Sequence, residues 1–272
     1  MNRPGALAAI YVALGVAVAA AVAPVPAAGQ WLARAAVVFA LPLAVGALGT
    51  RLLRPRSATR YRAAVALPAL RHVPLLAIVC ALELAALFVG LRLGWAKLEP
   101  GAGLASPLWI SALVIALPFA AFVSVVGWEW GLRARLYSVW AERLGPGAAG
   151  VASVAAGVAL ALVHVAPGLA VADRGFLAAG LVTLAAREAT ALRLFRRAGV
   201  LLSGTYRALA VGLDGLLIAD RLAWGSAALE TIAVDPRFYL VRAAGPVAAA
   251  IATWLFAARL DRRAAAERHL QP

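Results

Sequence analysis

The chain has 272 residues, of which 64% are hydrophobic and only 14% are charged. A soluble globular domain is about half apolar and about a quarter charged, so this composition excludes a water-soluble fold and favours helices that span a membrane. Basic residues outnumber acidic ones by 26 to 12, and because Lys97 is the only lysine, the net charge of +14 comes from arginine.

The arginines gather in short loops beside apolar runs. This pattern is typical of cytoplasmic membrane flanks rather than of a nucleic-acid-binding surface. We therefore expect the lipid bilayer as a partner and no nucleic acid. The single cysteine, Cys80, lies inside an apolar run, so a disulfide framework or a cysteine-rich metal site is excluded.

Eight apolar runs, bounded by charged residues or by Pro and Gly, are candidate membrane spans. In chain order they cover residues 5–23, 31–50, 73–91, 107–128, 148–166, 176–191, 199–219 and 239–258. The first run is longer than the core of a signal peptide, so we expect a retained anchor, and the fourth continues as a helix to about residue 143. The sequence therefore predicts an all-α, polytopic transmembrane helical bundle of about eight spans, forming a single integral membrane domain over 1–272.

Arginine clusters predict the orientation of these spans. Clusters follow the second, sixth and eighth spans, within 51–62, 193–197 and 259–268. All three fall on the cytoplasmic side if both termini are cytoplasmic, as the positive-inside rule requires. We therefore expect an integral protein of the plasma membrane, the inner membrane of a bacterium, with both termini in the cytoplasm.

An ionisable side chain inside a span is costly in hydrocarbon and is a functional candidate for that reason. The candidates are Glu83, Glu129, Arg133, Arg135, His164, Arg207 and Asp214. Glu188 lies next to Arg187 near the inner boundary, and we interpret those two as an ordinary interfacial pair. We interpret Glu83 as a structural partner, because no motif surrounds it.

The fourth and fifth spans are expected to form a hairpin at Gly145-Pro146-Gly147, which cannot continue a helix. Glu129 lies 17 residues before Pro146 and His164 lies 18 after it. At 1.5 Å per residue, both side chains come to the same depth, about 26 Å from the turn. Asp214 lies 17 residues beyond Arg197 and reaches a similar level, so three helices each place an ionisable residue at one depth.

The helix faces agree with this placement. Glu129 and Arg133 are four residues apart and share one stripe of their helix. The fifth span carries a small residue at every fourth position, which lets another helix approach closely, and His164 extends this seam into the bundle. The seam consists of Ala149, Ser153, Gly157 and Ala161. Structural interpretations stay open, because Glu129–Arg133 could be a buried pair that fixes helix packing and Asp214 could pair with Arg207.

The segment from Trp128 to Leu136, Trp-Glu-Trp-Gly-Leu-Arg-Ala-Arg-Leu, resembles the first motif of the CAAX-protease and bacteriocin-processing (CPBP, or ABI) family, which reads Glu-Glu-x-x-x-Arg followed by Gly and an apolar residue. The later segment Leu160-Ala-Leu-Val-His164 is similar to the family's Phe-x-x-x-His motif. The resemblance covers about 40 residues well, and it extends more loosely over a core of about 107–219. It implies an intramembrane endopeptidase of the glutamic type, which uses Glu and His to activate a water.

The sequence departs from this family pattern at several positions. Aligning Arg133 with the motif's Arg places Glu129 at the second Glu and Trp128 at the first, which is the one usually assigned to water activation. Leu160 replaces the Phe and Ala134 the Gly. The family's second His and its Asn support the oxyanion, but here no histidine lies between His164 and His269. Asp214 could stand at the Asn, which puts Ala210 at that His, and Arg207 is an alternative replacement.

From these residues we expect a CPBP-like protease that cleaves a membrane-associated peptide or protein. Glu129 would be the base, His164 its partner and Arg133 the group that orients the carboxylate, with Asp214 or Arg207 completing the site. We expect no cofactor and no metal, because one His with Glu and Asp makes a poor zinc site. Two alternatives remain, namely a catalytically inactive CPBP-like scaffold or peptide-binding protein, and a small transporter with carboxylates as proton sites.

Overall fold

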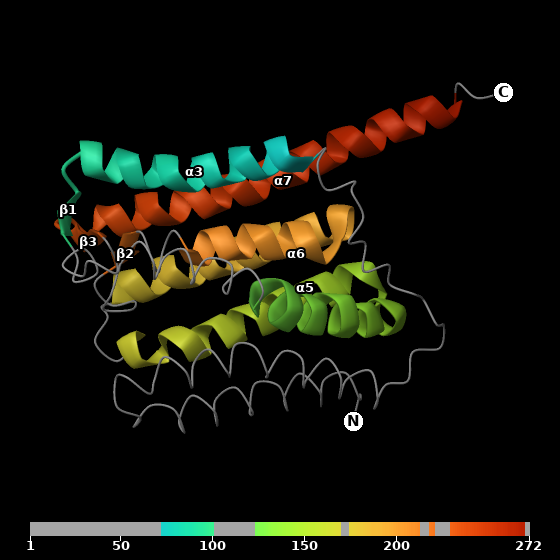
Figure 1. The fold of residues 1–272 in the computed structure, drawn as a ribbon, viewed down its shortest axis with the longest axis horizontal. Coiled ribbons are helices and arrows are strands. Elements are labelled where there is room, and N and C mark those ends of the chain that lie inside the picture. Colours follow the sequence, from blue (N-terminus) through green and yellow to red (C-terminus); the bar gives the residue numbers. More distant parts are fainter. Residues whose placement is uncertain (1–71, 101–122, 170–173, 213–217, 221–228, 270–272) are drawn as a thin grey trace.

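The computed structural model describes residues 72–100, 123–169, 174–212, 218–220 and 229–269. The predicted spans 5–23 and 31–50, most of 107–128 and the arginine cluster within 51–62 lie outside these residues. The described part is almost entirely helical, which confirms the predicted helical class for that part of the chain (Figure 1). Its helices are α3 (Val73–Arg92), η2 (Val123–Tyr137), α5 (Ser138–Leu169), α6 (Arg174–Gly212) and α7 (Arg237–His269).

Within the described residues, three helical stretches are long and apolar enough to cross a membrane. They are Val73–Arg92, Gly127–Leu162 and Arg237–Phe256. The first and last match the predicted spans 73–91 and 239–258, because a long apolar run is a strong local signal. The total of about eight spans stays a prediction.

The chain reverses at Gly145, which interrupts the helix with φ +79° and ψ 161°. A positive φ is open to glycine because it has no Cβ. One apolar core joins the two arms across this break, with Trp128 and Leu132 before it and Ala156 and Leu160 after it. The predicted reversal at Gly145-Pro146-Gly147 is therefore confirmed, whereas most of the fourth span lies outside the described residues.

Helix α6 reverses in the same way at Gly199, where φ is +81° and ψ is −169°. Arg187 in its first arm and Tyr206 in its second arm both contact Glu83 of α3, which requires the arms to lie side by side. The two arms correspond to the predicted spans 176–191 and 199–219. The second arm is described as helix only to Gly212.

Helix α6 lies at the centre of the described bundle. It packs against η2 and α5 on one side and against α7 and α3 on the other, and α3 lies along α7 (Figure 1). Two of the three apolar cores among the described residues fill these layers. The first joins η2, α5 and α6, and the second joins α3, α6 and α7 around Val79, Leu194 and Ala249.

A small sheet, which the sequence analysis did not predict, lies at one end of the bundle. Its strands are β1 (Ala96–Pro100), β2 (Ile218–Asp220) and β3 (Leu229–Ala233). The order is β1-β3-β2, with β1 antiparallel and β2 parallel to β3. Since β1 follows α3 and β3 precedes α7, the sheet ties these two helices together at this end (Figure 1).

Candidate functional site

Glu129 lies on η2 and is completely buried, as is Arg133 on the same helix. The guanidinium of Arg133 forms an ion pair with Oε1 of Glu129 through its Nη1 atom. The predicted sharing of one helical stripe by these two residues is confirmed. A buried carboxylate is stable only when it is paired and hydrogen-bonded, and Arg133 supplies the first of these contacts.

Arg133 also reaches across to α6. Its Nη2 atom lies 2.6 Å from Oε2 of Glu188 and donates to the backbone carbonyl of Glu188 at 3.1 Å. Glu188 is itself 1% exposed, so it belongs to the protein interior. One guanidinium therefore joins two carboxylates from different helices.

Arg207, on the second arm of α6, bridges the same two carboxylates. Its Nε donates to Oε1 of Glu129 at 3.1 Å, and its Nη2 lies 2.6 Å from Oε1 of Glu188. Its guanidinium carbon lies 4.3 Å from the ring centroid of Trp128, which adds a cation–π contact. We call Glu129, Arg133, Glu188 and Arg207 the four-residue network. Two carboxylates face two guanidiniums, so the charges balance.

The members of the network differ in accessibility. The side chain of Arg207 is 12% exposed, whereas the other three are at most 2% exposed. Arg207 is therefore the member through which a ligand can reach the network with the least rearrangement.

Ser203 adds a further donor to Glu129. Its fully buried hydroxyl donates to Oε2 of Glu129 at 2.6 Å. A carboxylate offers about four lone-pair sites, and those of Glu129 now receive Arg133, Arg207 and Ser203. A water that is to be activated by Glu129 must therefore use the remaining site or displace a donor.

One residue of the small-residue seam of α5, Gly157, lies against this network. Ala149, Ser153 and Gly157 are buried, as the seam predicts. A Cβ on residue 157 would lie 2.1 Å from Oε2 of Glu188, closer than any real contact. Glycine at this position is what lets Glu188 occupy the interface between α5 and α6.

A third buried carboxylate lies on the other side of α6. Glu83 of α3 accepts a hydrogen bond from the Tyr206 hydroxyl at 2.6 Å, and hydrogen bonds from Nε and Nη2 of Arg187 at 2.9 and 2.5 Å. Glu83 is 3% exposed. Arg187 and Tyr206, which bind Glu83, directly precede Glu188 and Arg207 in the sequence. Adjacent residues of α6 therefore contact two separate carboxylate clusters.

Of the residues expected to form the site, the structure brings Glu129, Arg133 and Arg207 together. Residue 164 lies in α5, but the His164 side chain and Asp214 lie outside what the structure describes. The pairing of Glu129 with His164 and the role of Asp214 therefore stay predictions.

The interpretation of Glu188 as an interfacial partner of Arg187 is wrong. Glu188 pairs with Arg133 and Arg207, while Arg187 pairs with Glu83. Sequence reasoning also missed Ser203. A signal was available for Glu188, since two arginines buried in one bundle need two carboxylates to neutralise them.

Among the described residues, no three His, Cys, Asp or Glu side chains lie close enough together to hold a metal ion. Comparisons of the chain with protein-family models, with curated proteins and with solved structures find no match.

Proposed function

We propose that the chain is an intramembrane endopeptidase of the CPBP type, which hydrolyses a peptide bond of a membrane-associated peptide or protein. The supporting observation is the meeting of three expected site residues from two separate helical segments. Glu129 and Arg133 come from the segment that resembles the family's first motif, and Arg207 comes from a helix about 70 residues later. We also propose a plasma-membrane location with both termini cytoplasmic, which the arginine clusters favour.

In the proposed reaction Glu129 is the general base. It accepts a proton from a water as the water oxygen bonds to the peptide carbonyl carbon. The proton then passes to the amine leaving group as the C–N bond breaks, with His164 relaying it. Arg133 and Ser203 hold the carboxylate in place from two sides, which keeps one of its oxygens directed at the water.

Arg207 has two tasks in this proposal. It holds Glu129 while no substrate is bound, and it turns to the carbonyl oxygen when a peptide arrives. This movement frees a lone pair of Glu129 for the water, and it places a positive charge at the developing oxyanion. Removal of one such donor costs about 3 kcal/mol in other hydrolases. Its partial exposure makes Arg207 the network member best suited to move.

The second candidate is a non-catalytic CPBP-like scaffold or peptide-binding protein. Two observations favour it. Trp128 occupies the position of the motif's first Glu, and donors occupy most of the lone pairs of Glu129. In that case the four-residue network serves to hold η2 and the two arms of α6 together.

Cleavage assays on the purified chain with a panel of membrane-tethered peptides test the proposal. We expect Glu129→Gln and His164→Ala each to lower the cleavage rate by at least about 100-fold, as for loss of a general acid–base group. Glu83→Gln is the matched control, because it changes a buried, arginine-paired glutamate outside the network. The enzyme proposal is wrong if the wild type cleaves no peptide or if Glu129→Gln cleaves normally. Peptide binding without cleavage would support the scaffold.

A further inference from the structure

Glu188 is the one member of the four-residue network that has no task in the proposed reaction. It lies on the first arm of α6, and its side chain is 2% exposed. Its two carboxylate oxygens contact different arginines. Oε2 lies 2.6 Å from Nη2 of Arg133, and Oε1 lies 2.6 Å from Nη2 of Arg207. The carboxylate of Glu188 therefore lies between the two guanidiniums.

Arg207 contacts its two carboxylates unequally. Its Nη2 atom lies 2.6 Å from Glu188, whereas its Nε atom donates to Glu129 at 3.1 Å. Strong charge-assisted contacts are short, so the contact with Glu188 is the stronger of the two. When Arg207 turns toward a substrate, we expect the longer contact to open first and the contact with Glu188 to remain.

The surroundings of Glu188 hold its carboxylate in one position. A Cβ on Gly157 would lie 2.1 Å from Oε2, so helix α5 packs directly against this carboxylate. Arg133 contacts both the side chain and the backbone carbonyl oxygen of Glu188. A group that is fixed by several neighbours can hold a functional side chain in its working geometry.

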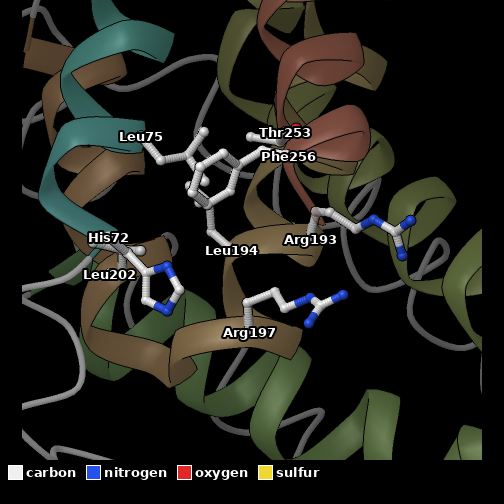
Figure 2. Close-up of a pocket in the computed structure, with 8 residues that line it drawn as sticks. All are labelled: His72, Leu75, Arg193, Leu194, Arg197, Leu202, Thr253 and Phe256. Carbon is white, nitrogen blue, oxygen red and sulfur yellow. The ribbon is translucent and has the colours of Figure 1, made fainter. Parts of the chain in front are cut away.

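The contacts of Arg207 favour a small shift over a large swing. Its guanidinium carbon lies 4.3 Å from the ring centroid of Trp128. Such a contact stays favourable out to about 6 Å, so the guanidinium can shift over the ring without losing it. The cavity between α3, α6 and α7, of about 10 Å³, gives no further room, because no member of the network lines it (Figure 2). A shift across Trp128 is compatible with a lasting contact to Glu188.

We infer that Glu188 is a positioning residue for Arg207. It anchors the Nη2 atom of Arg207 while the Nε atom moves from Glu129 to the carbonyl oxygen of the peptide. Under the proposed endopeptidase function, on which this role rests, Glu188 itself touches no substrate. Arg207 can then leave Glu129 without becoming an unpaired buried charge, since Glu188 still neutralises it. Glu129 keeps Arg133 and Ser203 during the same step.

The cleavage kinetics of Glu188→Gln test this role, with the purified full-length chain and membrane-tethered peptides. We expect kcat to fall about tenfold and KM to change less than about twofold, because a misplaced Arg207 weakens an interaction made only in the transition state. Rates are divided by the folded fraction from tryptophan fluorescence, so that a loss of stability alone does not lower kcat. Glu83→Gln is the matched control and should keep kcat, because it also changes a buried, arginine-paired glutamate.

A double-mutant cycle separates positioning from an independent effect. Arg207→Gln removes the positioned group, so adding Glu188→Gln should lower kcat by less than about a further twofold. The double variant keeps Glu129 paired with Arg133, so its charges still balance. This result supports the positioning role. Multiplicative losses, an unchanged kcat in Glu188→Gln, or a change confined to KM overturn it.

Failure of this role differs from failure of the proposed function. A wild type that cleaves no peptide overturns both, whereas a cleaving wild type with normal kcat in Glu188→Gln overturns only the role of Glu188. Should Glu188→Gln not fold, Arg207→Lys replaces it, because one ammonium cannot stay on Glu188 and reach the oxyanion together. We expect Arg207→Lys to lose as much kcat as Arg207→Gln, and a kcat near the wild-type value overturns the role.

Discussion

Gly157 and Glu188 lie so close together that a methyl group on residue 157 would stand 2.1 Å from the Oε2 atom of Glu188. The carboxylate thus occupies the space that any other residue would fill. Since Glu188 neutralises Arg133 and Arg207, this one glycine determines whether two buried guanidiniums keep their partner.

We therefore predict that Gly157→Ala destabilises the protein strongly, because Glu188 must move and leave buried charges uncompensated. The expected loss is about 3–5 kcal/mol, the usual cost of breaking a buried ion pair. Unfolding in mixed detergent micelles, followed by tryptophan fluorescence, measures it. Gly180→Ala is the control, because nothing lies within 4 Å of its added Cβ. Similar stability of the two variants would contradict the prediction.

The second prediction concerns the charge balance of the four-residue network. Arg133→Gln leaves Glu129 and Glu188 with only one guanidinium between them, that of Arg207, so we expect a loss of about 3–5 kcal/mol. Adding Glu188→Gln restores one carboxylate to one guanidinium, and the double variant should be more stable than the sum of the two single losses predicts, by about 1–3 kcal/mol. A double-mutant cycle in the same unfolding assay measures this coupling. Strict additivity would show that the two residues do not interact.

A third prediction addresses the cluster around Glu83. Tyr206→Phe removes the 2.6 Å hydrogen bond to Oε1 of a buried carboxylate, together with the contact of the same hydroxyl with Thr190. The expected loss is about 1.5–3 kcal/mol, as for hydrogen bonds to charged groups. Thr205→Ala, at the neighbouring position with its hydroxyl on the exposed side, should change stability by less than about 0.5 kcal/mol. Equal effects of the two substitutions would show that the hydrogen bond from Tyr206 to Glu83 does not stabilise the fold.

The fourth prediction concerns acid pH at the start of α7. Asp235 accepts hydrogen bonds from the side chain and the backbone N–H of Arg237, which lower the pKa of its carboxyl group from 3.8 to about 2. Because the folded-state pKa is the lower one, this contact stabilises the fold fully above about pH 4. The stabilisation is lost as the pH falls from about 4 to about 2.

Titration of the Asp235 carboxyl by NMR, in the wild type and in Arg237→Gln, measures this shift directly. We expect the pKa to rise most of the way back to 3.8 in the variant, because the side-chain hydrogen bond from Arg237 is the largest cause of the shift. Arg242→Gln, further along the same helix, should leave it unchanged. An unchanged value in Arg237→Gln would assign the shift to the backbone instead.

Parts of this fold follow from local sequence signals. The apolar runs at α3 and α7 are long enough to be recognised one at a time, and Gly145-Pro146-Gly147 marks a reversal on its own. The sheet could not be recognised in this way. Its strands have only three to five residues. In addition, β1 pairs with β3, which lies far from it in the sequence.

In the candidate site, too, contacts within one helix were predictable from the sequence and contacts between helices were not. Glu129 and Arg133 are four residues apart on one helix, so their contact was predictable. Arg187 and Glu188 are adjacent, which suggested a pair. Adjacent residues of a helix project about 100° apart, however, and here they reach different helices. Which neighbour each one meets depends on the reversal at Gly199 and on the packing of α6 between α3 and η2, and neither is visible in a local pattern.

The antiparallel pairing of β1 with β3 has a consequence for biosynthesis. It joins the end of α3 to the start of α7, so the helix that covers α3 emerges from the ribosome only after everything between Arg92 and Arg237 has been made. Until α7 has been made, that flank of α3 must contact something else, such as lipid or the insertion machinery. Chains that stop before α7 therefore lack the helix that covers this flank of α3.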